Sequence, residues 1–340
     1  MSTLLSWPFV VEVLGSFYSF FSFLVFGVFL AFSKKISVNL SLAFVFLLLG
    51  VVFFFLSPNG ALVALLVTKM FLGLTIGRNL EVIFPTSIKL LLALMLISIS
   101  LMAFSTNRND YVNFNFIVVW CLITISMFLS SWRVISLGTI VTVLSASRTG
   151  FVGLLILLFG QRSSQQYALF GKLALICIFF LLTFAFNERI FSFFDLILSN
   201  QVNSIDSFSG FDGSKSARIR LTQAALLIDN YQLWIFRGFD LQELEAIFHT
   251  NDGLSTTAFL HSSILLLLAA GGVFFFISIF VLLAFYVKAS LCKLNIPFLL
   301  IVSVAFASTM AVDKLYFWIA VGGALEAISR KSYKSASQYE

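Results

Sequence analysis

Long apolar runs separated by short polar segments dominate this chain. Runs close to the length of a bilayer-spanning helix recur along it, for example at residues 9–32, 36–57 and 258–286. A membrane-crossing helix needs about 20 mostly apolar residues. Because lipid offers no hydrogen-bond partners, each segment must satisfy its own backbone, which excludes open sheet. The pattern therefore predicts an all-α, polytopic integral membrane protein, although Phe, Val and Ile favour strands in water.

The overall composition agrees with this class. Hydrophobic residues make up 60% of the chain, charged residues 11%, and the mean hydropathy is +1.04, which lies outside the range of soluble domains. A net charge of +6 does not indicate a nucleic-acid partner, because Lys and Arg gather in the cytoplasmic loops of membrane proteins. The three cysteines have no CxxC spacing, so they indicate neither a disulfide framework nor a metal site.

The distribution of basic residues sets the predicted topology. Placing the basic residues of alternate short loops inside leaves one long hydrophilic segment, residues 187–257, on the outer face. We expect an N-terminal transmembrane bundle (1–186), this extracytoplasmic loop with short helices, and C-terminal helices with a cytoplasmic tail (258–340). We expect about eleven spans, within a range of about 10 to 12, at residues 9–32, 36–57, 61–77, 90–105, 114–132, 134–147, 149–161, 172–186, 258–286, 296–312 and 315–329.

Two adjacent spans, residues 134–147 and 149–161, are too short to cross ~30 Å of hydrocarbon at 1.5 Å per residue. A single helix over residues 134–160 is the alternative, and it would move the long loop to the inside. We predict the interrupted version, because helices that break within the membrane are tolerated where they line a protein-walled or watery cavity. Arg148 would then lie at the outer mouth of such a cavity.

Arg148 needs a partner or a ligand at that position, because an arginine inside a membrane helix costs about 2.5–3.5 kcal/mol on insertion. One alternative is structural, with the side chain reaching lipid phosphates or pairing with Asp195 or Asp313. The functional alternative is an anion-binding site, since the planar guanidinium fork suits phosphate oxygens.

The long loop carries further cations. Residues 216–228 have the spacing of an amphipathic helix, with Arg218 and Arg220 near its first turn, where a helix N-terminus also favours anions. The alternative is a charged face resting on anionic headgroups. An aromatic segment with a glycine turn, residues 230–239, follows and includes Arg237. We expect it to return to the membrane interface, which Trp and Tyr favour.

His261 begins the next apolar run, and Gly272 follows eleven residues later. A lone histidine in a membrane helix is often a hydrogen-bonded core residue. At the outer boundary beside a basic loop, however, an imidazole can accept a proton from a hydroxyl nucleophile. With two histidines and no metal-ligand spacing in the sequence, we predict no metal and no cofactor.

Four motifs follow one another along the chain: Ser147-Arg148-Thr149-Gly150, Ser216-x-Arg218 with Gln223-Ala224-Ala225-Leu226, the turn around Gly238, and His261 with Gly272. In this order they resemble the O-antigen polymerase and O-antigen ligase superfamily of bacterial envelopes over about residues 114–290. The chain departs from the family pattern at Ser262, Thr222, Ala270 and the single glycine of the 237–238 turn.

The resemblance implies a GT-C-like fold and a metal-independent, inverting glycosyltransferase. Such an enzyme polymerises undecaprenyl-pyrophosphate-linked oligosaccharide units at the periplasmic face of the bacterial inner membrane. By position, Arg148 and Arg218 match the arginines that handle the pyrophosphate, and His261 matches the histidine that activates the acceptor hydroxyl. Arg220 is added on proximity, and Ser147 and Arg237 as possible support.

Two other functions stay open. The first is an O-antigen ligase that transfers the glycan to lipid A core. The second is a flippase or transporter of the same lipids, although only Lys69 and Glu12 offer ionisable groups near the middle of a span. The expected partners are the lipid-linked donor and acceptor, membrane lipid and a chain-length regulator protein, with no nucleic acid.

Overall fold

The structure is a computed structural model of the chain. Every regular element in the part that it describes is a helix, which confirms the all-α prediction for that part. The predicted spans at 9–32 and 172–186 and the loop helix at 216–228 lie essentially outside the described residues. The described residues are 40–83, 87–104, 114–128, 131–145, 148–160, 228–240, 262–290, 296–308 and 311–336.

The longer described helices coincide with predicted spans. They form where apolar runs begin after polar turn residues and end where such residues return. In chain order the elements are α3 (Leu40–Leu56), α4 (Gly60–Ile83), α5 (Ile88–Phe104), α6 (Phe114–Met127), α7 (Trp132–Leu144), α8 (Arg148–Gly160), α12 (Tyr231–Trp234), α14 (Ser263–Ser290), α15 (Ile296–Ser308), the 3₁₀ helix η3 (Ala311–Asp313) and α16 (Leu315–Ala336).

Two of these helices are long and apolar enough to cross a membrane, over Gly60–Asn79 (20 residues) and Ser263–Lys288 (26 residues). The outer face of α3 is also apolar, with Phe44 63%, Leu47 64% and Phe55 80% exposed. Water penalises a continuous apolar surface of this kind, whereas lipid accepts it. Helix length and surface character thus both support a membrane protein.

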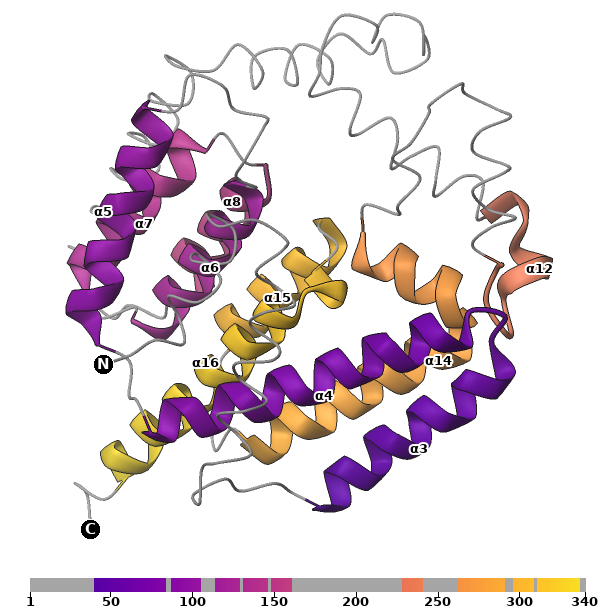
Figure 1. Ribbon diagram of the computed structural model, residues 1–340. Helices are drawn as coiled ribbons and strands as arrows, with labels where there is room; N and C mark the ends of the chain where they lie inside the picture. Colours follow the sequence, from indigo (N-terminus) through magenta and orange to yellow (C-terminus); the bar gives the residue numbers. More distant parts are fainter. Residues whose placement is uncertain are drawn as a thin grey trace, which may run out of the picture.

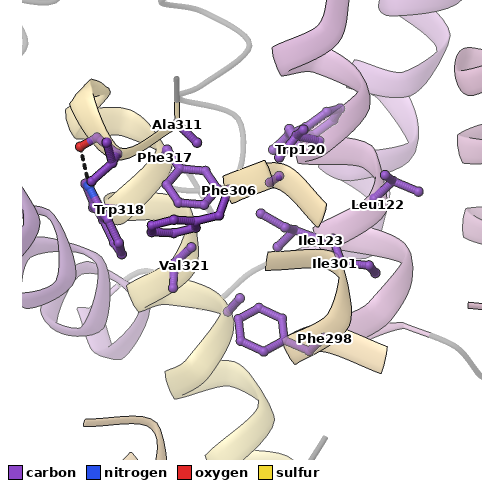
Figure 2. Close-up of a cluster of buried hydrophobic side chains, with 14 of the residues drawn as sticks. Trp120, Leu122, Ile123, Phe298, Ile301, Phe306, Ala311, Phe317, Trp318 and Val321 are labelled. Carbon is purple, nitrogen blue, oxygen red and sulfur yellow. Dashed lines mark hydrogen bonds between the residues drawn. The ribbon is translucent and has the colours of Figure 1, made fainter. Parts of the chain in front are cut away.

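Helices α5, α6, α7 and α8 lie on one side of the molecule and α3, α4, α12 and α14 on the other, with α15 and α16 between them (Figure 1). Figure 2 shows the apolar core where α6, α15 and α16 meet. Large rings and branched side chains fill this junction and leave little exposed surface. Its members include Trp120 and Ile123 of α6, Phe298, Ile301 and Phe306 of α15, and Phe317, Trp318 and Val321 of α16.

Glycines allow α4 and α16 to pack backbone against backbone. Gly73 and Gly77 form a G-x-x-x-G pair on α4. A Cβ atom at Gly77 would lie 2.7 Å from the backbone nitrogen of Gly323, and one at Gly322 would lie 2.5 Å from the carbonyl oxygen of Leu74. Small residues at this spacing are typical of close helix pairs in membranes. This pair makes the most extensive helix contact in the described part of the chain.

Candidate functional site

Helix α14 is kinked at Gly272, inside the apolar stretch Ser263–Lys288 that coincides with the predicted span over 258–286. Gly272 has φ 77° and ψ −175°, a backbone conformation that is essentially restricted to glycine. The break separates a first half-helix, Ser263–Gly271, from a second half that continues to Ser290. The hydropathy pattern missed the break because both halves are apolar.

The loop segment 231–239 fills this break. The backbone N–H of Val273 donates to the carbonyl of Ile235 at 2.9 Å, and that of Phe239 donates to the carbonyl of Ala269 at 2.6 Å. Polar backbone groups freed by a broken helix need such partners when they are shielded from water. The buried Trp234 side chain, 8% exposed, adds apolar contact. The loop thus returns to the helical bundle and docks on α14.

Two glycines make this docking possible. Gly238 has φ 90°, and a Cβ atom there would lie 2.5 Å from the carbonyl oxygen of Ala270. A Cβ atom at Gly272 would lie 2.8 Å from the carbonyl carbon of Phe236. At each glycine the backbone of the opposite segment therefore lies where a Cβ atom would be, and a larger residue at either position would push the segments apart. We call this contact between segment 231–239 and the break of α14 the glycine joint.

The turn between α3 and α4 is the third part of the glycine joint. The Ser57 hydroxyl donates to the carbonyl of Ala270 at 2.5 Å. The Asn59 side-chain amide donates to the carbonyl of Phe239 and, at 3.5 Å, to that of Ala270. Sequence reasoning missed both residues because Ser-Pro-Asn-Gly is an ordinary turn sequence. The joint therefore unites three distant parts of the chain.

The predicted interruption between residues 134–147 and 149–161 is confirmed. Helix α7 ends at Leu144 with Ser145 as its C-cap, and α8 begins at Arg148. The described residues thus form two separate helices, in agreement with the interrupted version rather than with one helix over 134–160. The structure describes the backbone of Arg148 as the first residue of α8, and its side chain lies outside the description.

Most of the other predicted site residues lie outside the described residues. These are Ser147, Arg218, Arg220 and His261, so the meeting of Arg148, Arg218 and His261 in one pocket stays a prediction. Arg237 is described, and its side chain is exposed beside the glycine joint. Its neighbour Phe236 stacks on Phe274 of α14 with ring centroids 5.9 Å apart.

An ion pair joins Lys69 of α4 to Asp313 of η3. The Lys69 ammonium lies 2.5 Å from the Asp313 carboxylate and also donates to the Asp313 carbonyl at 3.0 Å. The two side chains are 23% and 27% exposed. Asp313 is one of the two carboxylates named above as partners of Arg148; its carboxylate engages Lys69, and the pairing with Arg148 stays a prediction because that side chain lies outside the described part.

A second charged cluster lies at the far end of α4. The Glu326 carboxylate accepts from Nε of Arg78 at 3.3 Å and from Nε of Arg330 at 3.1 Å. The guanidinium of Arg78 also lies 5.6 Å from the ring centre of Tyr286, a cation–π distance. The cluster therefore holds the C-terminal parts of α4, α14 and α16 together.

No group of three or more His, Cys, Asp or Glu side chains that could hold a metal ion occurs within the described ranges. In comparisons with known proteins, no family model matches the chain, and no curated protein matches it either.

Proposed function

We propose that this protein is a glycosyltransferase of the O-antigen polymerase type, which joins undecaprenyl-pyrophosphate-linked repeat units at the outer face of the bacterial plasma membrane. The close packing of the Gly238 turn against Ala270 of α14, and of Gly272 against Phe236 of the loop, carries the proposal. In the resemblance, these glycines belong to the loop turn and to the motif that follows His261. The two glycines and the backbone hydrogen bonds beside them tie the end of the loop that bears Arg218 and Arg220 to the helix that follows the histidine.

The chemistry of this transfer suits the residue types involved. Breaking a glycosidic bond to pyrophosphate develops negative charge on the leaving group, and preorganised cations in a poorly hydrated cleft stabilise that charge better than water does. We assign this role to Arg148 and Arg218, with Arg220, Arg237 and Ser147 in support. His261 would accept the proton of the acceptor hydroxyl as it attacks the anomeric carbon. Such a mechanism requires no metal.

The distribution of charge supports an outer location for the glycine joint. The joint lies at the Gly60 end of α4, where the α3–α4 turn contacts α14. Arg78 and Arg330 meet at the opposite end of the same helices, and Lys288 lies in the last turn of α14. Because basic residues favour the cytoplasmic side, the joint and the loop docked on it would face outward.

A transporter of the same anionic lipids is a second candidate, and the Lys69–Asp313 ion pair is the observation that favours it. Ionisable groups within membrane helices often mark transport pathways. We rank it second because each partner of the pair already has a counter-ion, whereas the proposed transfer explains the whole order of motifs.

The test is deletion of the gene in its host, followed by analysis of the lipid-linked intermediates. A polymerase predicts that single repeat units accumulate and are capped onto lipid A. Long uncapped chains on the carrier would indicate a ligase and overturn the polymerase assignment. Intermediates held on the cytoplasmic leaflet would indicate a transporter. An unchanged glycan profile would remove the protein from this pathway.

A further inference from the structure

The Lys69–Asp313 ion pair joins α4 to η3 and is half-buried. Lys69 follows Gly60 by nine residues on α4, which places it about 14 Å from the α3–α4 turn at 1.5 Å per residue. If that turn lies at the outer boundary, the pair is about halfway through ~30 Å of hydrocarbon. Ser263, which is hydrogen-bonded to η3, then lies deeper than the outer boundary expected for the start of its apolar run. Ionisable residues at this depth are costly, so they usually serve a function.

The ion pair also holds the backbone of the short helix η3. Lys69 binds both the carboxylate and the backbone carbonyl of Asp313, so it restrains the main chain of η3. The neighbouring Val312 donates its backbone N–H to the Ser263 hydroxyl at 3.0 Å. The carbonyl of Val312 accepts from the indole N–H of Trp318 at 2.9 Å (Figure 2, dashed line). Helices α4, α14 and α16 thus all hold η3.

The contact with Ser263 links η3 to the proposed chemistry. Ser263 is the first residue of α14 and is fully buried, and Ser262 before it is 5% exposed. Ser262 is joined by a peptide bond to His261. Whatever holds Ser262 and Ser263 in place therefore holds the covalent attachment point of the proposed catalytic base.

We propose that Lys69 and Asp313 are positioning residues for the glycosyl transfer. They hold η3 against α4 and, through the Val312–Ser263 hydrogen bond, set the start of α14 to which His261 is attached. This inference rests on the proposed function. A small displacement of a catalytic group lowers the rate strongly, because the reacting atoms must be held close to their attack geometry. The pair therefore acts on turnover without touching the substrate.

A general role in packing α4 against α16 is the competing explanation, and the chain offers a matched control. Glu326 pairs with Arg78 between the same two helices, but at the end away from η3. Glu326→Gln removes that charge contact and leaves η3 intact. If packing alone mattered, Lys69→Met and Glu326→Gln would impair the protein alike.

The experiment uses the full-length protein reconstituted with lipid-linked repeat units. We expect Lys69→Met and Asp313→Asn to lower kcat at least tenfold, while KM for the donor changes less than twofold. Lys69→Arg, which keeps a cation and several donors, should retain at least a third of wild-type kcat. Glu326→Gln should lower kcat less than twofold.

Variants of Ser263 provide a second, independent test. Ser263→Ala should lower kcat because it removes the acceptor of the Val312 N–H, whereas Ser263→Thr should keep most activity. If Lys69 acts through Ser263, the double variant Lys69→Met/Ser263→Ala should be no slower than the slower single variant. Losses that multiply in the double variant would overturn this coupling.

Amide hydrogen exchange of the purified protein separates this inference from the proposed function. Exchange at Val312 should accelerate in Lys69→Met and stay at the wild-type rate in Glu326→Gln. Faster exchange with unchanged kcat would overturn the positioning role, and unchanged exchange would overturn the restraint of η3. A wild-type protein without any transfer activity would refute the proposed function, while the exchange data would still decide whether the pair holds η3.

Discussion

Replacing Gly272 by alanine tests whether the glycine joint holds the loop against α14. The native φ of 77° is strained for any residue with a side chain, at a cost of about 1–3 kcal/mol. The new Cβ atom would also lie 2.8 Å from the carbonyl carbon of Phe236 and 2.8 Å from the carbonyl oxygen of Trp234. Both neighbours are backbone atoms, so relief requires the whole segment to move.

That movement would break the hydrogen bonds Val273–Ile235 and Phe239–Ala269. Each contributes about 0.5–1.5 kcal/mol net. Together with the strain, the expected loss is about 2–6 kcal/mol, a large share of the stability of an ordinary domain. Gly50→Ala is the matched control, because a Cβ atom there would lie 3.6 Å from Val67, an ordinary contact. It should stabilise α3 by roughly 0.5–1 kcal/mol.

The assay is reversible unfolding of both variants in mixed micelles, followed by fluorescence, together with proteolysis of segment 231–239. Gly272→Ala should unfold at lower denaturant and release the segment to protease, and the glycan ladder of cells that carry it should shorten or disappear. If Gly272→Ala matches Gly50→Ala in stability and in protease resistance, the contact between segment 231–239 and α14 does not require glycine at position 272. The account of the joint is then incorrect.

Three further predictions concern single positions. His261→Ala should abolish glycan elongation while the protein remains inserted, and a normal ladder from that variant would remove His261 from the mechanism. Arg148→Lys should keep partial activity and Arg148→Ala almost none, because charge neutralisation is the proposed role; equal activity of both with the wild type would mark a structural arginine. Gly77→Val should lower the stability in micelles by several kcal/mol, about the size of other overpacking effects. The reason is that the valine side chain would meet the backbone of α16 near Gly323. A change no larger than that of Gly50→Ala would show that α4 and α16 can separate without loss of stability.

Local patterns predicted the helices well because lipid-facing segments must be both apolar and helical. The interruption before Arg148 was also predictable, since residues 134–147 and 149–161 are each too short to cross a bilayer. The break at Gly272 was not. Glycine is common in membrane helices, and Gly271-Gly272 becomes a break only because segment 231–239 supplies partners for the freed backbone groups.

For Lys69, too, local sequence patterns identify the residue and not its partner. Its place in an apolar run marked it as unusual, but nothing near it in the chain identified its partner. Asp313 lies 244 residues away and follows a different helix, so the pairing is a property of the tertiary structure. Ser57 and Asn59 were missed for the related reason that a turn sequence specifies its own backbone conformation and not the carbonyls it will meet.

Helix α14 is anchored along α4 on both sides of its break. The first half-helix of α14 is held at one end by η3, through Ser263, and at the other by the glycine joint. Both anchors lie along the α4 segment: Lys69 of α4 holds η3, and the turn just before Gly60 holds the joint. Nine residues separate Gly60 from Lys69, and nine separate Ser263 from Gly272, about 14 Å in each case. The second half changes direction at Gly272 (Figure 1) and contacts α4 further along, where the Tyr286 hydroxyl donates to the carbonyl of Leu74 at 3.5 Å.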